Sequence, residues 1–335
     1  MDMTPRELVR RTLNFSKPER VPRQLWLLPW AYIHYPRESA ALLNRFPDDI
    51  LHSPQFLRRP LQTWGNRYLP ETFTDEWGCT FHSVQAGIIG QVKTPMVTDW
   101  SLLDEVKPPV EAFDVDVERV NAYCRATDRY VLGGCMPRPF ERLQFLRGAE
   151  AVFLDLARRT PDLLVLLKRI HEFYVQEMEI WAETDVDGLM MMDDWGGQSA
   201  MLVSPATWRA LFKPLYAEYI DIAHRHGKSL WLHSDGHILA IMPDLIELGM
   251  DAINCQVSCM GVAALGEHCR GRITFWGEVD RQHVLPEGTR EDVRAAVHEM
   301  KAELYHDGGV IAQCEFGPGA NPDNVATVFE AWDEV

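Results

Sequence analysis

The stretch DGLMMMDDWGGQ (residues 187–198) joins an apolar run to two carboxylates and two glycines. The stretch SLWLHSDG (residues 229–236) repeats this arrangement, with a histidine and a carboxylate near its end. Near-continuous apolar runs of this length are typical of strands that are buried on both faces of a parallel sheet. The polar residues that follow them are therefore expected at the carboxyl edge of such a sheet.

On both sides of these two strands the chain alternates between apolar runs and long helical patterns. At least five consecutive βα units favour either a closed (β/α)8 barrel or an open doubly wound sheet, and periodicity alone does not choose. Polar residues after several successive strands favour the barrel, because barrel enzymes draw their sites from many strand ends. Neither G-x-G-x-x-G nor a P-loop follows an early strand, which weakens the nucleotide-binding alternatives. The predicted strands are 129–133, 187–192, 229–233, 251–254, 273–277 and 310–314, and the predicted helices are 161–183, 204–227, one ending before 249, 289–305 and one from 322.

The first 127 residues are less regular. They predict a helix over 4–13, and residues 78–98 alternate around Gly87 and Gly90 as a β-hairpin does. We expect this segment to cover one end of the barrel. The predicted fold is thus α/β, a (β/α)8 TIM barrel with an irregular N-terminal extension and a β-hairpin. It forms one domain over residues 1–335, with the cover and the first barrel elements in 1–127 and the regular βα units in 128–335.

Composition excludes several classes of protein. The 335 residues include 33 Lys+Arg and 49 Asp+Glu, a formal charge of −16, and 46% of them are hydrophobic. This apolar content argues against disorder, and the acidity argues against nucleic acid as a partner. The N-terminus lacks the apolar core of a secretory signal, and no apolar run reaches the ~18–20 residues of a membrane span. Seven cysteines, an odd number, fit reduced thiols, so we expect a cytoplasmic protein.

The sharpest candidate site combines His233 and Asp235 with Cys314, each at a strand end. Imidazole nitrogen, carboxylate oxygen and thiolate sulfur are the donors that Zn²⁺ accepts, and three protein ligands leave a position for substrate. Glu278 is a further candidate ligand or proton-transfer group, and it can equally pair with Arg281. The alternative for the set is ordinary burial, since buried Cys often acts as a small hydrophobe and strand-end His is often a core residue.

Two further groups of residues are candidates for substrate contact. Asp193 and Asp194 can hold a polar substrate group or act as acid or base, or one of them can simply cap the following turn. Gln198 lies in the same loop. Trp26 and Trp30 can form an aromatic wall for a planar ligand, although core packing is the alternative.

Several segments of the chain resemble the uroporphyrinogen decarboxylase superfamily. They are MTPRELVRRTLNFSKPERVP (3–22), DDWGGQSAMLVSPATWRALFKPLY (193–216), WLHSDGHILAIMPDLIELGMDAIN (231–254), ITFWGEVD (273–280) and the Cys314 segment. The resemblance spans nearly the whole chain and implies a single (β/α)8 barrel.

The superfamily divides between porphyrinogen decarboxylases and zinc-dependent methyltransferases that exchange methyl groups with a corrinoid protein. The decarboxylases carry an Arg-Gln-Ala-Gly-Arg-type motif that binds substrate carboxylates; here Arg23-Gln24 leads into Leu25-Trp26, and the second arginine is absent. The methyltransferases carry a His-x-Cys…Cys metal pattern. His233 and Cys314 match that pattern, and Asp235 replaces its first Cys.

The resemblance implies a metal-dependent methyltransferase that moves a methyl group between a small methylated substrate and a corrinoid protein. Zn²⁺ would be held by His233, Asp235 and Cys314, with Glu278 or Cys259 as a further ligand. Asp194 would be catalytic, and Asp193, Gln198, Trp26 and Trp30 would bind substrate, the tryptophans suiting an aromatic methyl ether. One alternative is a cofactor-free decarboxylase that uses Asp194 and Arg138. The other is a non-catalytic partner of a corrinoid protein.

Overall fold

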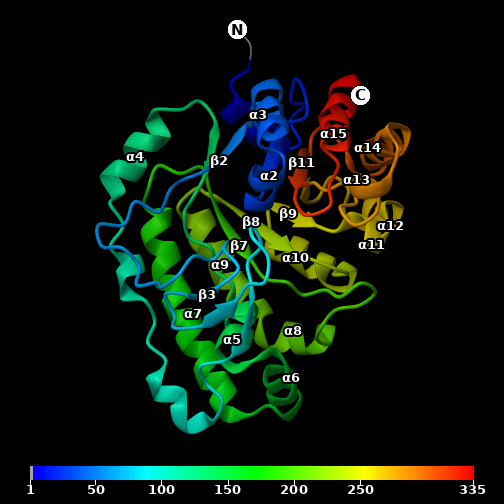
Figure 1. Ribbon diagram of the computed structural model, residues 1–335. Helices are drawn as coiled ribbons and strands as arrows, with labels where there is room; N and C mark the ends of the chain where they lie inside the picture. The colour runs from blue at the N-terminus through cyan, green and yellow to red at the C-terminus, as the bar shows by residue number, and fades with distance from the viewer. Residues whose placement is uncertain (1–2) are drawn as a thin grey trace.

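The computed structural model describes residues 3–335 and contains a nearly closed barrel of eight parallel strands with helices around it (Figure 1). The strands follow the order β1-β11-β10-β9-β8-β7-β6-β2. Each of the six strands predicted after residue 128 is present within two residues of its predicted limits, so the predicted barrel is confirmed. The barrel strands are β1 (Arg23–Leu27), β2 (Ile50–His52), β6 (Tyr130–Leu132), β7 (Gly188–Met192), β8 (Ser229–Ser234), β9 (Ala252–Cys255), β10 (Thr274–Trp276) and β11 (Val310–Phe316).

The helices occupy the connections between these strands. Among residues 3–335, none combines the length and the apolar character that a membrane crossing requires. The α-helices are α1 (Pro5–Leu13), α2 (Pro29–His34), α3 (Pro36–Arg45), α4 (Val117–Arg125), α5 (Pro139–Arg147), α6 (Ala149–Arg158), α7 (Pro161–Ala182), α8 (Pro205–Leu211), α9 (Lys213–Arg225), α10 (Met242–Leu248), α11 (Val257–Met260), α12 (Val262–Cys269), α13 (Val284–Glu287), α14 (Arg290–Leu304) and α15 (Pro322–Glu334), with 3₁₀ turns η1 (Trp100–Glu105), η2 (Val110–Phe113) and η3 (Leu239–Ile241).

The predicted helix over 204–227 is two helices in the structure. Ser204 caps α8 by accepting a hydrogen bond from the Thr207 N–H at 3.1 Å, as its sequence position suggests. The helical path then breaks at Phe212, and α9 begins with Pro214 in its first turn. Proline lacks the N–H that would bond back to the preceding turn, which is why one continuous helix was the wrong prediction.

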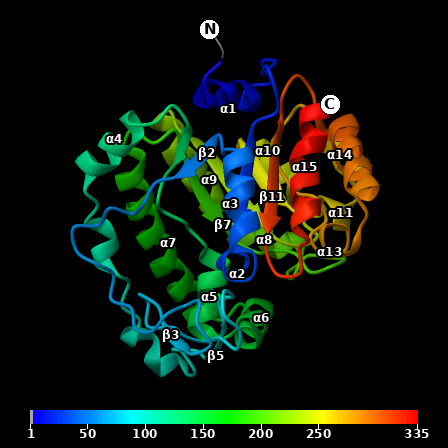
Figure 2. The ribbon, with the colours of Figure 1, turned by 45° about the horizontal axis from the view of Figure 1, so that its top comes forward.

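The predicted hairpin over 78–98 is confirmed as β4 (Thr80–His82) and β5 (Gln91–Thr94), which pair antiparallel. A third strand, β3 (Thr72–Thr74), extends the hairpin into a small sheet. In Figure 2 this sheet lies beside α5 and α6. Gly87 packs directly on the backbone of Trp30 in α2, the helix that follows β1, so the small sheet covers the carboxyl ends of barrel strands.

Large aromatic side chains fill the interior of the barrel. Trp276 meets Trp231 edge to face at 4.8 Å between ring centroids, and it meets Trp26 in the same way at 4.9 Å. Their polar atoms are satisfied, since the Trp26 and Trp276 ring N–H groups both donate to Gln24 Oε1, at 3.1 and 3.0 Å. This packed layer forms the floor beneath the carboxyl mouth.

Backbone hydrogen bonds and hydrogen bonds to side-chain carboxylates together close the barrel between β1 and β2. The Asp49 N–H donates to the Arg23 carbonyl at 2.9 Å, and the Asp49 carboxylate accepts from the Arg23 N–H at 2.8 Å. Asp48 accepts from the Leu25 N–H at 2.7 Å in the same way. Arg20 pairs with both oxygens of Asp49, at 2.6 and 2.7 Å, which balances its charge. Asp49 is 2% exposed, so these bonds are protected from water.

We expect Asp49→Ala to lower the free energy of unfolding by about 2 kcal/mol, because it removes a buried charged acceptor and leaves the Arg23 N–H unpaired. Asp333→Ala is the matched control. Asp333 pairs with Arg23 at 3.0 Å but is half exposed, so its loss should cost about 0.5 kcal/mol or less. Urea denaturation of both variants measures the difference, and equal stability would contradict the role given to Asp49.

Candidate metal centre at the carboxyl mouth

The loops after β7 and β8 touch through two glycines. A Cβ on Gly196 would lie 2.2 Å from the His237 nitrogen, and a Cβ on Gly236 would lie 2.2 Å from the Gly196 oxygen. Because neither residue has a side chain, the Gly196 N–H can donate to the Asp235 carbonyl at 3.1 Å. This contact brings the ends of the two strands together.

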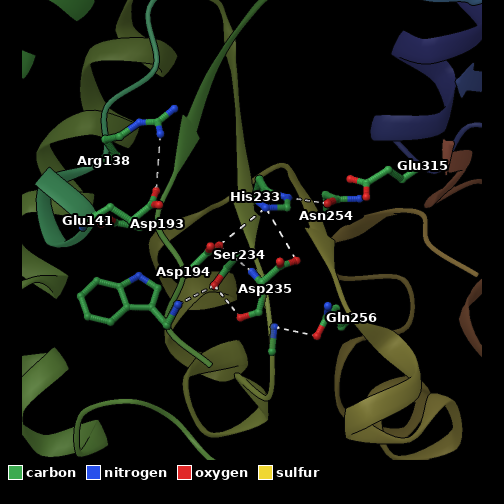
Figure 3. A network of polar contacts seen from close by, with 12 residues as sticks. Arg138, Glu141, Asp193, Asp194, His233, Ser234, Asp235, Asn254, Gln256 and Glu315 are labelled. Atoms are coloured by element: carbon green, nitrogen blue, oxygen red, sulfur yellow. Dashed lines mark hydrogen bonds and ion pairs between the residues drawn. The ribbon is translucent and has the colours of Figure 1, made fainter. Parts of the chain in front are cut away.

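The close approach gathers three side chains of types that can hold a metal ion, Asp194, His233 and Asp235 (Figure 3). Each offers a donor atom, and these atoms lie within 4.8 Å of one another. His233 Nε2 is 3.6 Å from Asp194 Oδ1 and 3.8 Å from Asp235 Oδ1. The Asp235 N–H donates to Asp194 Oδ1 at 2.9 Å, which positions the two carboxylates relative to each other.

A chain of hydrogen bonds determines which nitrogen of the neutral His233 ring carries the hydrogen. Its Nδ1 lies 2.6 Å from Asn254 Oδ1, while the Asn254 amide nitrogen donates to the Trp276 carbonyl at 2.5 Å and to Gln313 Oε1 at 3.2 Å. Asn254 thus presents an acceptor to Nδ1, so Nδ1 carries the proton in the neutral ring. The lone pair of Nε2 then faces the two carboxylates. Metal-binding histidines commonly have such an acceptor on their other ring nitrogen.

Arg281 lies on the other side of Asp235, and the sequence pattern gave it no role beyond a possible pairing with Glu278. It forms a short ion pair with Asp235 and contacts both oxygens of Glu315, at 3.1 and 3.2 Å. Its Nε is 3.6 Å from Glu278 Oε1, so the predicted alternative pairing is present. Burial raises the pKa of Glu278 to about 8, against the opposing effect of Arg281, so Glu278 is mainly protonated at neutral pH.

Glu141 is a second residue that the sequence pattern did not single out. Its Oε2 is buried and has no hydrogen-bond partner among residues 3–335, with Arg138 Nη1 at 3.8 Å. Burial raises the pKa of Glu141 to about 7, and the charge of Asp194 adds to this shift. Glu141 lies in the first turn of α5, the helix after β6, and sequence distance alone gave no sign that it would lie near Asp194.

Asp193 faces away from the cluster. Its carboxylate is fully buried and accepts hydrogen bonds from the N–H groups of Phe140 and Glu141, at 3.0 and 2.9 Å, and from the Tyr216 hydroxyl at 3.2 Å. Asp193 therefore stabilises the N-terminus of α5. The structure thus places this predicted substrate-binding carboxylate against α5, where all three of its hydrogen bonds are internal. These bonds support the alternative in which one of the two aspartates is a capping residue, although Asp193 caps helix α5 and not the turn that follows it.

Cys314 also differs from its predicted place. Gln313 points inward to Asn254, and successive residues of a strand face opposite sides, so the Cys314 side chain points outward. It is fully buried in the apolar layer outside the barrel interior and is not among the donor atoms gathered around His233. Strand alternation thus separates Cys314 from the ion that it was expected to share with His233.

The predicted aromatic wall is only partly assembled. Trp26 lies against His233, with ring centroids 5.5 Å apart. Trp30 instead stacks on His34 at 4.3 Å and is buried, which is the core-packing alternative. Gln198 is exposed in the loop after β7. The structure brings together Asp194, His233, Asp235 and Trp26, with Glu278 beyond Arg281.

A (β/α)8 barrel with a polar cluster at the carboxyl ends of its strands has the architecture of the barrel enzymes. A family model described as uroporphyrinogen decarboxylase (URO-D) matches residues 72–335. The chain belongs to this family, as its sequence motifs predicted.

A solved structure shares the fold. A methyltransferase from Methanosarcina mazei superposes with a TM-score of 0.66 at 18% identity, covering 99% of each chain. A B12-independent methionine synthase from Shewanella sp. W3-18-1 has a TM-score of 0.48 at 14% identity, covering 95% of this chain and 94% of that one. The search of curated proteins found no match.

Two adjacent glycines test the loop contact. We expect Gly196→Ala to cost about 1–3 kcal/mol of unfolding free energy, because its methyl group would overlap the backbone of the next loop. Gly197→Ala should cost much less, since its Cβ would lie 3.5 Å from the nearest atom, the Ala200 oxygen. Thermal denaturation compares the two variants. A destabilisation that is the same for both would show that the close approach is not the constraint.

Proposed function

We propose that the protein is a metal-dependent methyltransferase that moves a methyl group between a small methylated substrate and a corrinoid carried by a separate protein. The observation that carries the proposal is the Asp194–His233–Asp235 cluster, with the Nε2 lone pair of its histidine directed at two carboxylates. Membership of the family and the fold shared with the Methanosarcina methyltransferase support a methyltransferase as the class of enzyme.

The donor set fits a divalent cation. One imidazole nitrogen and two carboxylate oxygens are ligands that Zn²⁺ accepts, and three protein ligands leave a position for substrate. Compared with the predicted set, a carboxylate from Asp194 takes the place of the Cys314 thiolate. The resulting site is harder, and it favours an oxygen-containing substrate group more than a thiolate-rich site would.

The residues around the cluster have separable roles in this proposal. When bound, the metal would act as a Lewis acid toward the substrate heteroatom. Asn254 holds the Nδ1 proton of His233, and Arg281 holds Asp235 in place. Trp26 shields one side of His233 from water and offers a flat face to substrate. Glu141, whose pKa is raised to about 7, carries a proton in roughly half of the molecules at pH 7 and would supply it to a departing alkoxide.

Metal analysis separates the ligand set of the structure from the one predicted from sequence. We expect about one equivalent of Zn²⁺ per chain after purification without chelator, and loss of that metal in His233→Ala. Cys314→Ser should retain it, because the thiol lies outside the cluster. Asn254→Ala should weaken binding by roughly 10–100-fold through loss of the His233 partner. Metal loss in Cys314→Ser with retention in His233→Ala would overturn this ligand set.

A transfer assay tests the reaction itself. We expect metal-loaded protein to convert free cob(I)alamin to methylcobalamin with 2-methoxyphenol or methanol as donor, or to demethylate methylcobalamin with a thiol acceptor, as followed by visible absorption. His233→Ala should abolish the conversion. Release of carbon dioxide from a porphyrinogen by metal-free protein would replace this proposal with the decarboxylase alternative. Association with a corrinoid protein without any turnover would favour the non-catalytic alternative.

A further inference from the structure

A cavity of about 880 Å³ has Arg138, the neighbour of Glu141, in its lining. Its lining includes Phe73 and Phe81 of the small sheet, Gln55 after β2, Gly134 after β6, and Glu177 of α7. None of the three clustered donors, Asp194, His233 and Asp235, lines it. Its size lies within the range of roughly 300–1,000 Å³ that is usual for small-molecule sites.

Three arginines line this cavity, and the carboxylates present do not neutralise all of them. Arg142 is 5% exposed and pairs with Asp75 at 2.5 Å and with Glu76 at 3.2 Å. These two bonds occupy both carboxylates, yet the Arg142 Nε–H still has no partner among residues 3–335. An unpaired buried donor of this kind is costly unless a ligand or water accepts from it.

The other two arginines are less well paired. Arg67 lies over the Phe73 ring, 5.0 Å from its centroid, and within residues 3–335 no carboxylate comes within 4.0 Å of its guanidinium. Arg138 has one carboxylate, Glu141, at 3.8 Å. In a chain with a formal charge of −16, these two guanidiniums of the cavity lining, Arg138 half-buried and Arg67 exposed, form a local positive region that favours an anion.

Glu177 adds a further donor rather than an opposing charge. It is 7% exposed and forms no hydrogen bond or ion pair among residues 3–335. Burial raises its pKa to about 8, and the carboxylate of Glu76 adds to the shift. At neutral pH its carboxyl group is therefore mainly protonated, so it can donate to an acceptor atom of a ligand.

The walls of the cavity are aromatic. The Arg142 guanidinium lies over the Trp77 ring, 5.0 Å from its centroid, and 5.4 Å from that of Phe145, so aromatic rings adjoin the charged groups. Aromatic side chains on the wall are Phe73, Trp77, Phe81, Phe145, Phe173 and Tyr174. Such walls favour a planar ring by offset or edge contact.

We propose that this cavity binds a small aromatic carboxylate, with its ring against the aromatic wall and its carboxylate toward Arg138, Arg142 and Glu177. The weakly paired Arg138 and the unbonded Glu177 give donors for the oxygens of the ligand, and the guanidinium charge of Arg142 lies in the same lining. Binding at this site does not require metal or methyl transfer. Its failure is therefore distinguishable from failure of the proposed function.

Titration calorimetry on the full chain tests the proposal with 2-naphthoate as probe. We expect saturable binding of 2-naphthoate, and binding at least roughly tenfold weaker for its neutral isostere 2-naphthamide and for the non-aromatic cyclohexanecarboxylate. Arg138→Gln should weaken 2-naphthoate by a similar factor. Arg158→Gln, an exposed arginine of α6 outside the cavity, is the matched control and should bind as the wild type does.

Two results would overturn the proposal. One is equal affinity for the acid and the amide in the wild type. The other is loss of 2-naphthoate binding in His233→Ala with full retention in Arg138→Gln, which would assign the ligand to the metal centre.

The pH profile gives a readout that a purely structural role would not move. Above pH 8 ionised Glu177 repels the ligand, so wild-type affinity should fall as pH rises from 7 to 9. Glu177→Gln keeps a donor and cannot ionise, so its affinity should stay level over that range. A wild-type fall that persists in Glu177→Gln would remove Glu177 from the site. The titratable and charged groups that face Glu177 are Glu76, Cys135, Arg138, Arg142, Tyr174 and Tyr219.

Discussion

The closure of the barrel between β1 and β2 sets the direction in which every strand presents its side chains. β2 has three residues and forms its ladder with β6, so carboxylates take over part of the backbone pairing toward β1. Asp49 and Asp48 accept the N–H groups of Arg23 and Leu25. With the circle of strands closed, the inner face of each strand points into one packed interior and the residues beyond it point into one mouth.

Strand alternation then decides which polar residues meet in that mouth. On β8 the inward face carries Trp231 and His233, and Asp235 follows two residues later. On β11 it carries Gln313, which is why the hydrogen bonds of His233 run through Asn254 to Gln313 and not to Cys314. A side chain one position earlier or later along a strand points to the opposite face, so its donor atom lies away from the site even when its chemistry suits a metal.

The fold was predictable from sequence because buried parallel strands are near-continuous apolar runs, and these are visible without any contact information. The site was predictable only in part. Asp193 and Asp194 are neighbours with the same chemistry, and the deciding partner of Asp193 is the N-terminus of α5, more than fifty residues earlier in the chain. Arg281 and Glu141 owe their place to loops whose paths no local pattern reveals.

The balance of charge around Arg281 connects the geometry to the choice of ion. Asp194, Asp235 and Glu315 carry three formal negative charges against one guanidinium, while the raised pKa of Glu278 leaves that group mainly neutral below pH 8. Two negative charges remain in a half-buried mouth, and a divalent cation neutralises them. Arg281 already holds one oxygen of Asp235, so the cation competes with an arginine for that carboxylate. The positive charge of Arg281 thus holds Asp235 in place. It also lowers the affinity of the site for metal, compared with a site in which the second carboxylate is free.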